Sequence, residues 1–112
     1  MIDWSRVSEL YEDFGEDEFS EIIDVFLEEG VEGLEQLSFA QSDAQNMAAF
    51  HFLKGAALNL GFVELSQICA LGETAAREGQ DVTLLKAQVL EHLPATCQVL
   101  KTQWRQYLVG SS

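Results

Sequence analysis

Apolar residues recur at intervals of three and four along most of the chain, a spacing typical of α-helices that bury one face. Strand-like runs of valine, isoleucine and threonine are missing, and Pro94 is the single proline. Residues with a high helix propensity dominate instead. This pattern predicts an all-α protein.

The same spacing, and the residues that interrupt it, predict five helical segments at about residues 3–14, 16–40, 43–60, 63–78 and 81–109. Gly15, Gly61 and Gly79 follow three of these segments, where a left-handed residue can end a helix. Ser42 and Gln45 have the spacing of a capping box in front of the third segment.

Apolar stripes predict which side of each segment faces the core. In segment 16–40 the stripe comprises Phe19, Ile22, Ile23, Phe26, Leu27, Val31, Leu34 and Leu37. In segment 63–78 it narrows to small residues around Gly72, which we expect to allow the close approach of a neighbouring helix. Pro94 removes one backbone hydrogen bond from the last segment. Because the stripe continues in phase across Pro94, we favour a kink there over a break into two helices.

Four long amphipathic segments joined by short loops favour an antiparallel up-down four-helix bundle. The short first segment is expected to lie across one end of it as a lid. A length of 112 residues is that of one domain, so we predict one helical bundle domain over residues 1–112.

The chain is strongly acidic, with 19 acidic and 6 basic residues and a net charge of −13. Nucleic-acid binding needs a basic face, and an anionic membrane would repel the chain, so we expect neither partner. The acidity is typical of a solvated outer face. Alternatively, it selects partners with a basic surface.

Cys69 and Cys97 fall inside predicted helices without the spacing of a metal site, and we interpret them as reduced core thiols. The first residues do not resemble a signal peptide, and no apolar stretch reaches membrane-spanning length. We therefore expect a cytoplasmic protein, or an excised module of one, without a bound metal.

The run from His51 to Gly61 carries the strongest functional signal in the chain. Helical spacing makes His51, Lys54 and Gly55 neighbours on one surface strip. On a helical wheel, the arc opposite His51 faces the core and comprises Asn46, Ala49, Phe50, Leu53, Ala57 and Leu60. His51 is therefore predicted to face water, beside the ammonium group of Lys54 and the backbone of Gly55, which no side chain covers.

The strip around His51 is also unusually apolar for the solvent side of a bundle helix, which ordinarily carries Glu, Lys and Gln. It includes Ala44, Met47, Ala48 and Leu58. Such a patch marks an interaction surface, so we predict that a partner protein docks here. A neutral imidazole is nucleophilic, and Lys54 would stabilise the oxygens of a transferring phosphoryl group. The strip is thus suited to a phosphoryl-accepting histidine.

These residues resemble the signature of the histidine-containing phosphotransfer (HPt) domain of two-component phosphorelays, which is close to His-x-Leu-Lys-Gly-x-x-x-x-Leu-Gly. The positions that match in register are His51, Leu53, Lys54, Gly55, Leu60 and Gly61. The segment from Ala70 to Gly79 is more weakly similar to the family's fourth-helix segment. Phe52 and Leu58 are bulkier than the small or polar residues common at those places.

The resemblance implies a phosphorelay intermediate that accepts a phosphoryl group on His51 from the aspartyl phosphate of one receiver domain and passes it to another. It also implies that Lys54 is the electrostatic partner and that Gly55 allows close approach. The implied partners are receiver domains of hybrid sensor kinases and response regulators, which hold their own Mg²⁺. This chain would need no cofactor, and without a phosphate-binding loop or kinase signature it should not phosphorylate itself. We expect a monomer.

Three alternatives compete with this interpretation. A di-metal bundle needs Glu-x-x-His pairs, but Ala48 and Val89 stand where His51 and His92 would need their glutamates. A hydrolase needs a second catalytic group near His51, which nothing marks. The alternative that stays open is a non-catalytic HPt-like adaptor, or a phosphate sink, that docks receiver domains. His92 has no cationic neighbour in register and is interpreted as structural.

Overall fold

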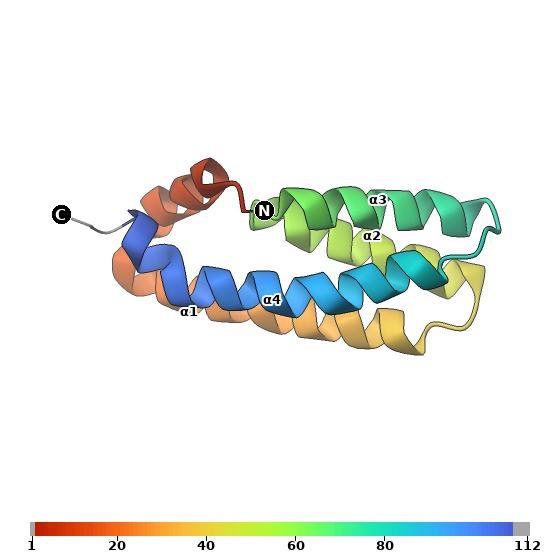
Figure 1. The fold of residues 1–112 in the computed structure, drawn as a ribbon. Coiled ribbons are helices and arrows are strands. Elements are labelled where there is room, and N and C mark those ends of the chain that lie inside the picture. The colour runs from red at the N-terminus through yellow and green to blue at the C-terminus, as the bar shows by residue number, and fades with distance from the viewer. Residues whose placement is uncertain (1, 109–112) are drawn as a thin grey trace.

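The computed structural model describes residues 2–108, which form four helices: α1 (Trp4–Phe39), α2 (Asp43–Asn59), α3 (Val63–Arg77) and α4 (Thr83–Leu108). The helices run up and down, and each packs against two others in the cyclic order α1, α2, α3, α4 (Figure 1). The bundle is elongated, with extents of 50 × 20 × 20 Å. The predicted all-α four-helix bundle is confirmed.

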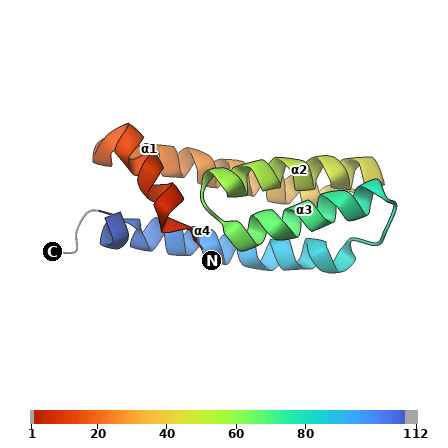
Figure 2. The ribbon, with the colours of Figure 1, turned by 90° about the horizontal axis from the view of Figure 1, so that it is seen from above.

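Helix α1 changes direction at Gly15, whose φ of 78° and ψ of 168° are not helical. Residues 4–14 therefore form a separate helical segment, which turns back across one end of the bundle (red in Figures 1 and 2). Its Trp4 ring stacks on Tyr107 at 4.1 Å between ring centroids, and Tyr11 lies against Trp104 of α4. The predicted lid is confirmed, although the ψ of Gly15 is extended and not that of a left-handed cap.

The turn from α2 to α3 is a Schellman motif, as the glycine at position 61 predicts. Gly61 has a φ of 72°, and the backbone N–H of Phe62 donates to the carbonyl of Ala57 at 2.8 Å. The backbone N–H of Asp3 donates to the carbonyl of Gly61 at 2.6 Å, which ties the start of the chain to this turn. A side chain at position 61 would collide with Asp3, so the turn needs glycine for two reasons.

The start of α2 carries the predicted cap. The Ser42 hydroxyl accepts from the backbone N–H of Gln45 at 3.1 Å, and the Gln45 side chain accepts from the backbone N–H of Gln41 at 2.8 Å. The first bond satisfies a backbone donor that the first turn of a helix otherwise leaves free, and the second holds the residue before the cap. At the far end, the turn centred on Gly61 stops α2 after Asn59. The limits of the helix that carries His51 are thus set locally.

The predicted core-facing arc of α2 is buried throughout: Asn46, Ala49, Phe50, Leu53, Ala57 and Leu60. Gly72 of α3 lies against the fully buried ring of Phe50, which confirms the expected close approach. The stripe predicted for α1 is wrong at Val31, which is 57% exposed. Gly30 and Gly33 take the inward positions beside it, because α1 packs closely against its neighbours there.

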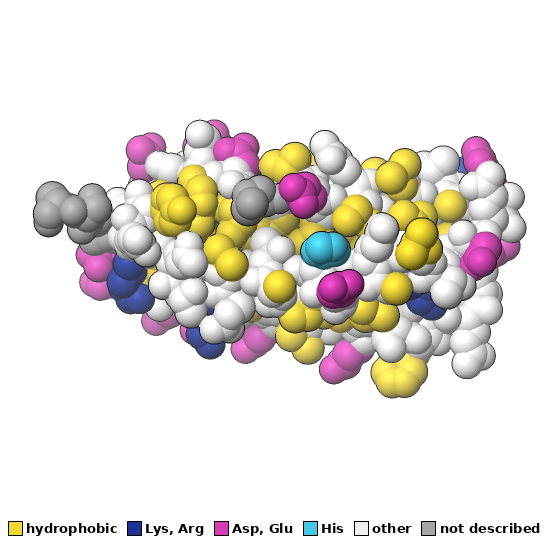
Figure 3. All heavy atoms as spheres, in the orientation of Figure 1, with side chains coloured by type: hydrophobic (Ala, Val, Ile, Leu, Met, Phe, Trp, Pro, Cys, Tyr) yellow, Lys and Arg dark blue, Asp and Glu magenta, His cyan; other side chains and the backbone are white. Residues whose placement is uncertain are grey.

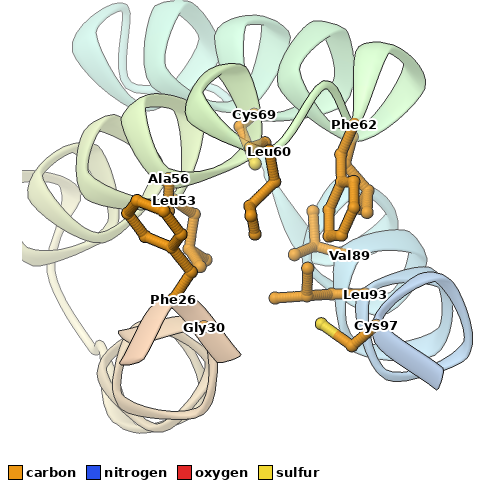
Figure 4. Close-up of a pocket in the computed structure, with 12 residues that line it drawn as sticks. Phe26, Gly30, Leu53, Ala56, Leu60, Phe62, Cys69, Val89, Leu93 and Cys97 are labelled. Atoms are coloured by element: carbon orange, nitrogen blue, oxygen red, sulfur yellow. The ribbon is translucent and has the colours of Figure 1, made fainter. Parts of the chain in front are cut away.

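Helix α4 continues without a break through Pro94, so the lost hydrogen bond does not divide it. Its predicted end at Val109 lies outside the described residues. Cys69 and Cys97 are free thiols that line a small apolar cavity of about 10 Å³ in the middle of the bundle (Figure 4). Burial raises the pKa of the Cys69 thiol to about 12 and that of Cys97 to about 11, so both stay protonated at neutral pH.

Candidate functional site

His51 lies on the outer face of α2, with 68% of its side chain exposed. This orientation follows from the burial of the opposite arc, which fixes the rotation of α2 about its axis. Lys54 follows one turn later and is partly exposed. Helical packing thus holds an imidazole and an ammonium group side by side at the surface of the bundle, as the sequence predicts.

A carboxylate that the sequence did not single out completes this cluster. Glu73 of α3 is 11% exposed in its side chain, and its Oε2 lies 2.8 Å from Nδ1 of His51. Its Oε1 accepts a hydrogen bond from Nζ of Lys54 at 2.5 Å. The guanidinium of Arg77, one turn further along α3, lies 3.7 Å from Oε2. Glu73 is therefore held between an imidazole and two cations.

The bond to Glu73 determines which ring nitrogen of His51 can react. An ionised carboxylate only accepts hydrogen bonds, so Nδ1 must carry the proton and donate it. In a neutral ring, Nε2 is then the nitrogen with the free lone pair. Because the side chain is largely exposed, an incoming electrophile can approach it. The site presents an oriented nucleophile toward solvent.

Glu73 is ionised at neutral pH. The hydrogen bond from Lys54 holds the pKa of this carboxyl below its ordinary value, the bond from His51 acts in the same direction, and burial opposes both. A depressed folded-state pKa means that the charged form stabilises the fold. The charge of Glu73 thus serves both the bundle and the orientation of His51.

We expect this stabilisation to depend on pH. The stabilisation by the Glu73 charge is fully present above the unfolded-state pKa of a glutamate, about 4.3. It is lost as the pH falls through the lower pKa that Glu73 has in the folded state. Denaturant unfolding should show Glu73→Gln to be less stable than the wild-type chain at pH 7, with the difference shrinking as the pH falls from 5 to 3. A difference that stays constant over this range would contradict the assigned role of the Glu73 charge.

The space around His51 is open on the side of Gly55. A Cβ atom added to Gly55 would meet no atom within 4 Å outside its own helix. Of the four predicted docking residues, Ala44, Ala48 and Leu58 are exposed, and Met47 is half-buried against the core. An outer strip of small and apolar side chains therefore surrounds the histidine.

A comparison with models of protein families identifies the family of this chain. The family model of the Hpt domain matches residues 21–108, from the long part of α1 to the end of α4. The chain belongs to the Hpt domain family. Neither the comparison with curated proteins nor that with solved structures gave a match. Membership supports a phosphotransfer role in two-component systems, in which Hpt domains interact with receiver domains.

Two signals in the sequence of this Hpt domain point to Glu73. Helices α2 and α3 form a hairpin around Gly61, so residues at similar distances from Gly61 lie opposite each other. His51 precedes Gly61 by ten positions, and Glu73 follows it by twelve. An acidic residue among the small residues of an inward-facing stripe was the second signal. Neither signal gives the distance between the two side chains.

The rest of the described surface offers no comparable site in this Hpt domain. His92 is exposed on α4, and residues 2–108 contain no group of three or more His, Cys, Asp and Glu side chains placed to hold a metal ion. The face of α3 and α4 shows acidic side chains along its edges and near its middle, and few basic ones (Figure 3). Within the same residues, no helix has the length and apolar character needed to cross a membrane.

Proposed function

We propose that this Hpt domain is a phosphorelay intermediate that takes a phosphoryl group from a receiver-domain aspartyl phosphate onto Nε2 of His51 and passes it to a second receiver domain. The observation that carries the proposal is the contact between Nδ1 of His51 and Glu73, which leaves Nε2 as the free nitrogen of a largely exposed side chain. A bundle that only docked receivers would have no need for this orientation, whereas a phosphate sink would share it and differ in not passing the group on.

The proposed reaction is an in-line displacement at phosphorus. The lone pair of Nε2 forms the N–P bond while the bond from phosphorus to the aspartyl oxygen breaks, and the receiver recovers its carboxylate. Nδ1 keeps its proton, so the ring becomes a phosphorylated imidazolium. The carboxylate of Glu73, 2.8 Å from Nδ1, stabilises the positive charge that develops on the ring. Reversal of these steps delivers the group to the next receiver.

Lys54 supplies positive charge on the side from which the phosphoryl group arrives. Its ammonium has three donors, of which Glu73 uses one. The others are available to oxygens of the group in transfer, whose negative charge grows in the transition state. The Mg²⁺ that phosphoryl transfer requires belongs to the acidic pocket of the receiver. We further propose that the domain acts as a monomer in the cytoplasm, where free thiols such as Cys69 and Cys97 persist.

Incubation with a panel of phosphorylated receiver domains tests this function. The proposal predicts that at least one receiver transfers phosphate to the chain and that the label is acid-labile and alkali-stable, as a phosphoramidate bond is. A second, unphosphorylated receiver should then remove the label. Stable binding of receivers without any transfer would favour the adaptor, and label that no receiver removes would favour the phosphate sink.

Substitution Gly55→Glu should block receiver docking. It places a bulky carboxylate on the open side of His51, facing a partner whose own active site is acidic, and like charges across an interface cost several kcal/mol. We expect transfer from the receiver to fall by about a hundredfold. Gly55→Ala is the matched control, because its Cβ meets no atom within 4 Å and should leave transfer nearly unchanged. Normal transfer to Gly55→Glu would remove the case for this docking face.

A further inference from the structure

Phe39, at the end of α1, is the most exposed large apolar side chain in the part of the chain that the structure describes, with 78% of its surface accessible. It lines an open groove of about 300 Å³ between the end of α1 and the beginning of α2. The other residues of this groove, here called the Phe39 groove, are Gln36, Ala40, Gln45 and Ala48. An exposed aromatic ring beside a groove is typical of a binding surface.

The Phe39 groove is continuous with the strip that surrounds His51. Ala48 belongs to both, and it precedes His51 by three residues, which makes the two neighbours on the surface of α2. A specific interface covers about 800 Å² on each partner, whereas a helix is only about 10 Å wide. A receiver that covers His51 must therefore also contact the elements beside α2. On the side of α1, that surface is the Phe39 groove.

Charge distinguishes this groove from two others on the molecule. None of its five lining residues is charged, although the chain carries a net charge of −13. The groove beside Leu58 includes Asp3, Arg6 and Glu9. The groove between α1 and α4 includes Asp24, Glu28 and Lys101. A receiver brings an acidic pocket to His51, so an uncharged flank lets it approach without added repulsion.

We propose that Phe39 is the apolar anchor of the receiver-docking surface, packing against an apolar side chain of the receiver while the acidic pocket lies over His51. This inference rests on the proposed function. Phe39 does not contact the reacting atoms. Its effect is on the affinity for the receiver and on the choice among receivers.

Transfer kinetics from a receiver that phosphorylates the wild-type chain test the role of Phe39. Truncation of an aromatic anchor lowers affinity by roughly thirtyfold. We therefore expect Phe39→Ala to lower kcat/KM for transfer by about thirtyfold and to leave kcat at saturating receiver unchanged. Val31→Ala is the control, because Val31 is also exposed on α1 but lies beside Lys101, in the groove between α1 and α4. It should leave both constants unchanged.

Labelling with phosphoramidate, a small phosphodonor that needs no docking surface, separates the possible failures. It should label the wild-type chain and both variants equally. If phosphoramidate labels the wild-type chain but no phosphorylated receiver labels it, the proposed function fails, and the role of Phe39 fails with it. If a receiver labels wild type and Phe39→Ala with the same kcat/KM, only the role of Phe39 is overturned. The chain could also form a dimer that the Phe39→Ala substitution dissociates while transfer stays at the wild-type rate. That result would assign the groove to a second copy of the chain and would also overturn the proposal.

Discussion

Substitution of His51 by glutamine is expected to abolish phosphoryl labelling of the chain by receivers and by phosphoramidate alike. Glutamine has the polarity to remain at an exposed position but lacks a nucleophilic nitrogen, because its amide lone pair is delocalised. The side chain of His51 is 68% exposed, so its replacement should not disturb the core. Circular dichroism should therefore show unchanged helicity, while radiolabel incorporation falls to background.

His92→Gln is the matched control for this experiment, since His92 is the only other histidine of the chain. It lies on α4, whereas the acceptor cluster is formed by α2 and α3. We expect His92→Gln to be labelled at the wild-type rate. Label retained by His51→Gln and lost in His92→Gln would move the acceptor site to α4.

Substitution of Gly72 by alanine is expected to destabilise the bundle by about 1–3 kcal/mol, as over-packing of a core does. An added Cβ would overlap three atoms of the Phe50 ring, two of them at 2.5 Å. Phe50 is fully buried, so its ring can move only by displacing other side chains of a close-packed core. This clash outweighs the gain of about 1 kcal/mol that alanine brings to a helix interior. Urea unfolding of the two chains measures the difference.

Gly30→Ala is expected to have the opposite effect. Its Cβ would meet only Leu93, at an ordinary contact distance of 3.7 Å, and would point toward the small cavity that Gly30 lines. The variant should therefore be more stable than wild type by about 0.5–1 kcal/mol, because alanine loses less backbone entropy on folding. Equal destabilisation by Gly30→Ala and Gly72→Ala would show that the close contact with Phe50 is not the cause.

Local rules explain why much of the structure could be predicted from the sequence. The cap at Ser42 and the left-handed turn at Gly61 depend on a few neighbouring residues, and they set the limits of α2. The rotation of α2 follows from the spacing of its apolar residues, which places His51, Lys54 and Gly55 together. The predicted strip around the histidine needed no knowledge of the other helices.

Contacts between helices account for what the sequence did not reveal. Glu73 reaches His51 only because α3 packs at one particular height and rotation against α2. The apolar pattern predicts a buried Val31, because it does not show that Gly30 and Gly33 face inward. Phe39 is apolar and was not singled out, and its exposure follows from its position at the end of α1. Each of these depends on residues far apart in the chain.

The most direct test of the central claim is nuclear magnetic resonance of the ¹⁵N-labelled chain after phosphorylation by a receiver, which identifies the nitrogen bonded to phosphorus. We predict a single phosphorylated ring, that of His51, with phosphorus on Nε2 and a proton on Nδ1, next to Glu73. Phosphorus on Nδ1 of His51, or on the ring of His92, would contradict the account.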